Sequence, residues 1–113
     1  MLLLLLATLA AAQQMSEDRL RFSVRQFYQL QIDKKWREAA DLVALDSNDD
    51  YWNSKKPQFR SVSIDQVELG EDKAHAKVTV TEKSFIRPDL VKVTSWKSEN
   101  GEWRCACRTE ANE

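Results

Sequence analysis

The spacing of apolar residues changes part-way along this chain, and the change limits the elements that it can form. In the first half, Leu20, Val24 and Phe27 recur three or four positions apart, as on one face of an α-helix. In the second half, Val78 and Val80 alternate with polar residues, which is the period of a strand with one buried face. Helices followed by strands within 113 residues predict one α+β domain, with N-terminal helices packed on an antiparallel sheet.

Two helices are predicted before the sheet, each with its own capping residue. Ser16 precedes two acidic residues, and this order is typical of a helix start. Asp33 can cap a second helix, with Trp36 on its apolar side. Gln31 falls inside the apolar stripe of the first helix. Its amide either meets backbone groups near the helix end or lines a pocket.

The strand region predicts a four-stranded meander that ends in a tight hairpin. The apolar alternation shifts phase near Asp65, as a β-bulge would make it do. The Asn-Gly pair at 100–101 tolerates the positive φ angles of a two-residue type I′ turn. A two-residue turn places Trp96 opposite Cys105. One face of this hairpin then carries Trp96, Trp103, Cys105 and Cys107.

The two cysteines are open to three interpretations. In a regular strand, Cys105 and Cys107 would lie nearly 7 Å apart at Cα, so a disulfide between them requires a bulge or a distorted strand end. They can instead be two buried thiols. Metal or redox chemistry is the third interpretation, but structural zinc requires four ligands and His75 is the single histidine.

The first twelve residues differ in kind from the rest of the chain. They are apolar and uncharged and end in three alanines, which resembles the apolar region and cleavage site of a secretory signal peptide. Residues 1–12 are therefore predicted to be a signal peptide and 13–113 the domain, which gives an exported protein, periplasmic or secreted. The run is too short for a transmembrane segment. A formal net charge of −1 gives no reason to expect a nucleic-acid partner.

Three stretches resemble the NTF2-like (cystatin-like α+β, cone-shaped) superfamily, namely FYQLQIDKKWREAADLV, EDKAHAKVTVTE and SWKSENGEWR. The resemblance implies a curved sheet wrapped around the first helix, with a pocket between them. It also implies that aromatic side chains line or close this pocket, although the same side chains can equally well fill a core. The candidate ligand-binding residues are Tyr28, Gln31, Trp36, Tyr51, Trp52, Trp96 and Trp103.

Enzymes of this fold hold a carboxylate base inside the cone, and the apolar strand faces carry no acidic residue before Glu82. His75 alternates onto the polar face of its strand. No catalytic residue, metal site or cofactor is therefore predicted. We expect a homodimeric, non-enzymatic domain that binds a small apolar ligand or a protein partner through the concave sheet face. The alternatives are an isomerase- or dehydratase-like enzyme using the same pocket, and a structural interaction module that uses the outer sheet face.

Overall fold

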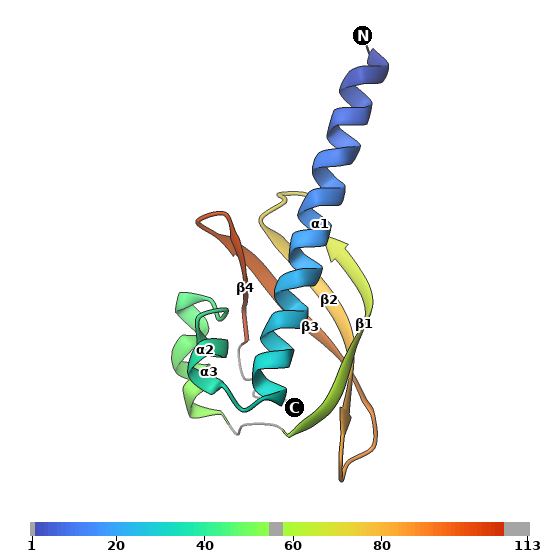
Figure 1. The fold of residues 1–113 in the computed structure, drawn as a ribbon. Helices are drawn as coiled ribbons and strands as arrows, with labels where there is room; N and C mark the ends of the chain where they lie inside the picture. The colour runs from blue at the N-terminus through green and yellow to red at the C-terminus, as the bar shows by residue number, and fades with distance from the viewer. Residues whose placement is uncertain (1, 55–57, 108–113) are drawn as a thin grey trace.

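The computed structural model describes the backbone of residues 2–54 and 58–107, and the side chains of these ranges from Ser16 onward. N-terminal helices pack against a strongly curled antiparallel sheet of four strands, which forms a half-barrel (Figure 1), so the predicted α+β class is confirmed. The elements are α1 (Leu2–Ile32), α2 (Trp36–Ala40), the 3₁₀ turn η1 (Leu45–Ser47), α3 (Asn48–Asn53), β1 (Phe59–Leu69), β2 (His75–Ser84), β3 (Leu90–Glu99) and β4 (Glu102–Cys105).

The sheet is a meander in which each strand pairs with the next, in the order β1-β2-β3-β4. The register of β1 against β2 shifts between Phe59 and Ser61 and again between Ile64 and Gln66. The second shift confirms the bulge predicted near Asp65. Bulges bend a strand and increase its twist, so two of them in β1 help the sheet to curl around α1. As the first of the four described strands, β1 has one edge with no described strand beside it, and this edge faces α1 (Figure 1).

Helix α1 crosses the concave side of the sheet and runs on past its edge (Figure 1). Leu20, Val24 and Phe27 are buried, as their spacing predicts. The predicted start at Ser16 is wrong, because α1 runs through this position from Leu2. The preceding sequence is rich in leucine and alanine, which favour the helical backbone, and residues 2–15 contain no glycine or proline to end the helix. None of the helices in the described ranges is both apolar enough and long enough to cross a membrane.

The C-terminal end of α1 is closed by two backbone hydrogen bonds. The N–H of Lys34 donates to the carbonyl of Gln31 at 3.0 Å, and the N–H of Lys35 donates to that of Leu30 at 2.8 Å. This is the Schellman arrangement, and it places Lys34 at φ 62°. Asp33 does not cap α2 as predicted, because its carboxylate instead accepts from Gln29 at 3.1 Å. The left-handed turn at Lys34 separates Asp33 from the first turn of α2.

Replacing Lys34 with glycine is expected to raise the free energy of unfolding by about 0.5 to 1 kcal/mol. A left-handed backbone costs an L-residue about 1 kcal/mol or more, and glycine has no Cβ to resist it. Lys34 is exposed, so its side chain contributes little packing. Urea unfolding of the variant beside Lys35→Gly provides the measurement, since Lys35 lies next to it at negative φ (φ −91°). Equal effects at both positions would contradict this explanation.

The β3–β4 hairpin has the predicted register. Asn100 and Gly101 both have positive φ, at 53° and 81°, and Trp96 lies opposite Cys105. Strand β4 ends at Cys105, and beyond this end Cys105 and Cys107 are joined in a disulfide with their Cα atoms 5.2 Å apart. Of the three interpretations, the structure therefore shows the disulfide. It lies at a strand end, where the two Cα atoms can come closer together than in a regular strand.

The outer edge of β4 is covered by the segment that follows α2. Cys105 donates to the carbonyl of Leu42 at 2.7 Å and accepts from the N–H of Ala44 at 2.8 Å, so Val43 forms a parallel bridge to Cys105. Lys97 of β3 contacts the carboxylate of Asp46 at 2.9 Å. The connection between α2 and α3 is thereby held against the hairpin.

Candidate functional site

The middle of the concave face is filled by aromatic side chains. Phe27 lies at their centre, with ring centroids 5.6 Å from Tyr28, 6.1 Å from Tyr51 and 5.7 Å from Trp96. Trp96 is 1% exposed, and its indole N–H donates to Thr94 at 3.0 Å. These rings come from α1, α3 and β3. Together they fill the interior, where a pocket was one of the two expectations from the sequence.

The other candidate ligand-binding residues have different surroundings. Trp103 and Gln31 are buried in or beside the same core, and Trp36 is half-buried. Trp52 is 44% exposed, with its ring 5.5 Å from that of Tyr51. The structure thus brings Tyr28, Tyr51 and Trp96 together as packing partners. A ligand-binding role for these seven side chains stays a prediction.

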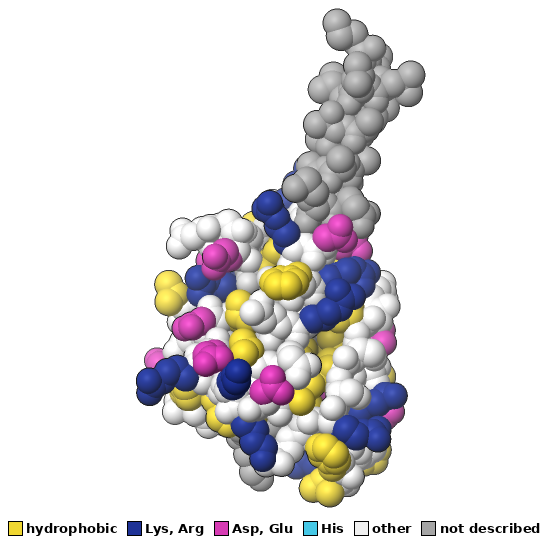
Figure 2. All heavy atoms as spheres, viewed as in Figure 1, with side chains coloured by type: hydrophobic (Ala, Val, Ile, Leu, Met, Phe, Trp, Pro, Cys, Tyr) yellow, Lys and Arg dark blue, Asp and Glu magenta, His cyan; other side chains and the backbone are white. Residues whose placement is uncertain are grey.

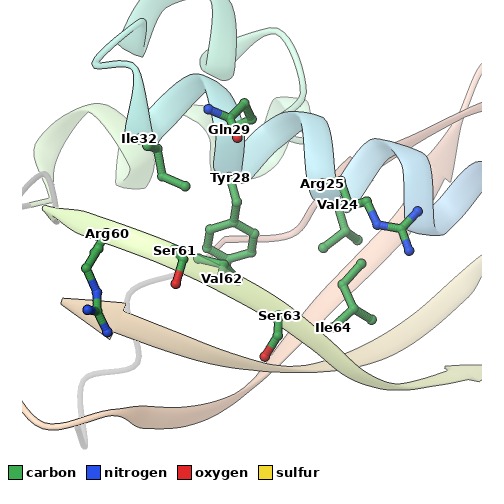
Figure 3. A pocket seen from close by; sticks show the side chains of 10 residues that line it. All are labelled: Val24, Arg25, Tyr28, Gln29, Ile32, Arg60, Ser61, Val62, Ser63 and Ile64. Atoms are coloured by element: carbon green, nitrogen blue, oxygen red, sulfur yellow. The ribbon is translucent and has the colours of Figure 1, made fainter.

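A groove of about 420 Å³ lies to one side of this core, between α1 and β1 (Figure 3). Val24, Tyr28 and Ile32 are four positions apart on α1, so they point from one helix face towards the strand (Figure 3). Val62 and Ile64 are two positions apart on β1 and meet them from the sheet. We call this space the α1–β1 groove. Its floor is the β1 end of the concave face.

Polar side chains surround this apolar floor. Arg25 and Gln29 come from the exposed side of α1, one helical turn apart. Arg60 extends from β1 at the opposite end of the groove from Arg25 (Figure 3). Ser61 and Ser63 add hydroxyl groups along the strand. The groove therefore combines an apolar floor with hydrogen-bonding groups and positive charge at its rim.

One buried polar pair adjoins the groove. The hydroxyl of Tyr28 donates to the carboxylate of Glu82 on β2 at 3.0 Å, and both side chains are buried. Burial, together with the charge of Glu82 and the hydrogen bond to it, raises the pKa of Tyr28 above its usual range. Tyr28 is therefore a neutral donor at neutral pH. The pair fixes the Tyr28 ring between the core and the groove.

The histidine and the two cysteines lie apart from this groove. His75 is exposed on the outer sheet face, where its Nδ1 lies 2.6 Å from the carboxylate of Asp72. The N–H of Ala74 and the contact with His75 hold the pKa of Asp72 below its usual value. Cys105 faces the core and is disulfide-bonded, so His75 and Cys105 are on opposite faces. In residues 16–54 and 58–107, no three potential metal-ligating side chains are grouped together.

The sequence interpretation overlooked most of the groove. The spacing of Val24, Tyr28 and Ile32 could have indicated that one helix face extends beyond the core stripe. No comparable pattern indicated that residues 60–64 would line the groove. They do so because β1 lies at the sheet edge, beside α1.

The chain matches no family model, no curated protein and no solved structure. The α+β architecture is therefore supported by the structure alone.

Proposed function

We propose that this domain is a non-enzymatic binding module that holds a small amphipathic ligand in the α1–β1 groove. The observation that carries the proposal is the groove itself, with about 420 Å³ of space, an apolar floor and a polar rim. Small-molecule sites are typically hollows of about 300 to 1,000 Å³. The groove lies within this range of volume, and five of its ten lining residues are polar or charged. We also propose the NTF2-like superfamily as the origin of the fold, supported by a curled sheet around a long first helix.

The filled core explains why the ligand is assigned to the groove. A ligand in the centre of the concave face would have to displace Trp96 or Phe27, which are both buried. A ligand in the groove would contact side chains that are already partly open, such as Ile32, Val62 and Ile64. Binding there requires no rearrangement of the core.

A valine-to-threonine pair on β1 tests this proposal. Val62 and Val67 are both half-buried on the same strand, but only Val62 lines the groove. Threonine keeps the shape of valine and replaces one methyl group with a hydroxyl. Binding of decanol, measured by NMR titration, is expected to weaken about fourfold in Val62→Thr, since one buried methyl contributes about 0.8 kcal/mol. Val67→Thr should bind as the wild type does. No binding to the wild type, or equal loss in both variants, would contradict the proposal.

A second candidate function, an interaction module, is favoured by one apolar patch. Five of the eight exposed large apolar side chains in the described ranges lie between residues 85 and 93. Strand β3 pairs with β4 only over Trp96–Glu99, so its first residues have β2 on one side and no described strand on the other. Such an edge can pair with a further strand. The exposed apolar side chains at or near this edge are Phe85, Ile86, Leu90, Val91 and Val93.

We propose that this edge of β3 pairs with the same edge in a second copy of the chain. Antiparallel pairing centred on Val91 places Lys92 opposite Leu90 of the second copy, whereas pairing centred on Lys92 would oppose two like charges. Sedimentation equilibrium is expected to show a dimer that Val91→Lys dissociates. Gln66→Lys adds the same charge at an exposed position of β1, two strands away from β3, and should leave the dimer intact. A monomeric wild type would rule out this candidate.

Export remains part of the proposal. A disulfide persists in oxidising compartments, which supports an exported chain. Described core contacts of α1 begin at Leu20, well after residue 12, so removal of residues 1–12 would leave them in place. The intact mass of the protein from its host should correspond to a chain that begins at Gln13. A mass that includes Met1 would contradict cleavage.

A further inference from the structure

The charges that line the α1–β1 groove are all of one sign. Its ten lining residues include Arg25 and Arg60 and no aspartate or glutamate. Both arginines are exposed, and neither forms an ion pair with a carboxylate in the described part of the chain. Figure 2 shows basic side chains with apolar surface between them along the side of the domain that carries β1 in Figure 1.

Carboxylates near the groove have other partners. Asp65 accepts hydrogen bonds from Ser63 and Thr81 at the outer side of the sheet. Glu82 lies behind the Tyr28 ring and accepts the hydrogen bond of its hydroxyl. Neither carboxylate is among the lining residues. The charged side chains among the lining residues are therefore the two arginines.

We propose that the groove selects an anionic amphiphile, with an apolar chain on the floor and a carboxylate at the arginine rim. This inference rests on the proposed function and names its ligand class. A guanidinium binds a carboxylate through two parallel N–H donors, and such charge-assisted bonds are stronger than neutral ones. Ser61 can donate to the same head group, whereas the hydroxyl of Ser63 donates to Asp65. A cationic head group would find no carboxylate among the lining residues.

The arrangement suits an elongated ligand. Val24 and Ile32 are eight residues apart, which corresponds to about 12 Å along a helix. Arg25 and Arg60 stand at opposite ends of this apolar stretch (Figure 3). A chain lying along the floor can therefore reach an arginine with its head group in either direction. Removing one arginine leaves the other orientation available, so the test requires the double variant.

Three ligands with the same ten-carbon chain test the inference on the full-length protein. Decanoate, decanol and decyltrimethylammonium differ in head-group charge, and their affinities can be compared by NMR titration at neutral pH. Decanoate is expected to bind about tenfold more tightly than decanol, as a charge-assisted hydrogen bond would provide, and the cation more weakly than decanol. The decanoate affinity should fall with added salt while the decanol affinity does not, because salt screens exposed charges.

A matched pair of double variants assigns the effect to the rim. Arg25→Gln/Arg60→Gln should reduce decanoate binding to the level of decanol and leave decanol binding unchanged. The control, Arg37→Gln/Arg87→Gln, removes two exposed arginines outside the groove lining, with the same change in net charge. An equal loss of decanoate affinity in the control would overturn the inference, since the net charge of the protein would then explain the loss. Equal wild-type affinity for decanoate and decanol would overturn the charge selectivity alone. Failure of all three ligands to bind would instead overturn the proposed function.

Discussion

Replacing Trp96 with alanine is expected to lower the free energy of unfolding by about 4 kcal/mol. Trp96 is 1% exposed, and its ring packs edge-on against Phe27 with centroids 5.7 Å apart. Truncating a buried large aromatic removes its transfer free energy and leaves a cavity, which together cost about 3 to 5 kcal/mol. The change also removes a donor to the hydroxyl of Thr94. A small domain has about 5 to 15 kcal/mol in total, so the variant will be marginally folded. Urea unfolding followed by far-UV circular dichroism measures the difference.

Trp52→Ala provides the matched control for this prediction. Trp52 is the same residue type but 44% exposed on α3. Its loss should cost about 1 kcal/mol or less, as for substitutions near the surface. Similar losses for the two tryptophans would mean that the aromatic cluster is not the core of the domain.

Replacing Tyr28 with phenylalanine is expected to cost about 2 to 3 kcal/mol, although only one oxygen atom is lost. The hydroxyl of Tyr28 donates to the buried carboxylate of Glu82 at 3.0 Å. Phenylalanine keeps the ring contacts with Phe27 and Phe59 but leaves this carboxylate without its donor. Burying an unsatisfied polar group costs about 1 to 3 kcal/mol, and more when it is charged. A thermodynamic cycle with Glu82→Leu, which removes the acceptor, separates the pairwise contribution from the rest. Additive losses in the double variant would exclude a direct interaction.

The same pair predicts a loss of stability at alkaline pH. The folded pKa of Tyr28 lies above its usual value of about 10, so the unfolded chain releases this proton first as pH rises. The contribution of Tyr28 is fully present below pH of about 10 and decreases as pH rises beyond it. Wild-type stability should therefore fall more steeply in this range than that of Tyr28→Phe. Parallel curves for the two proteins would contradict the raised pKa.

Local patterns were sufficient to predict most of the fold. The Asn-Gly turn determines the register of β3 against β4, because only residues that tolerate positive φ fit a two-residue turn. The helical spacing of Leu20, Val24 and Phe27 identifies the buried face of α1. Helix ends were predicted less well. Ser16 could cap a helix, but α1 continues through it, and the left-handed turn at Lys34 had no glycine to indicate it.

The position of the groove depends on tertiary structure in a way that the sequence pattern does not show. Aromatic residues fill a core or line a pocket with the same spacing, and the difference depends on whether elements far apart in the chain meet. Here Tyr51 of α3 and Trp96 of β3 both reach Phe27, so the interior is closed. The open space lies instead where β1, the first described strand of the sheet, passes α1. This position is set by strand order, which alternation within one strand does not reveal.

The position of a bound ligand tests the central claim most directly. Intermolecular nuclear Overhauser effects can be recorded between a ten-carbon amphiphile and protein whose valine and isoleucine methyl groups are labelled with ¹³C. If the ligand binds in the α1–β1 groove, its chain should contact Val62, Ile64 and Ile32 and give no contacts to Val43 or Val78, which are buried in the core outside the groove lining. Contacts to Val43 and Val78 would mean that the aromatic core opens to admit the ligand, and would contradict the assignment of the site to the groove.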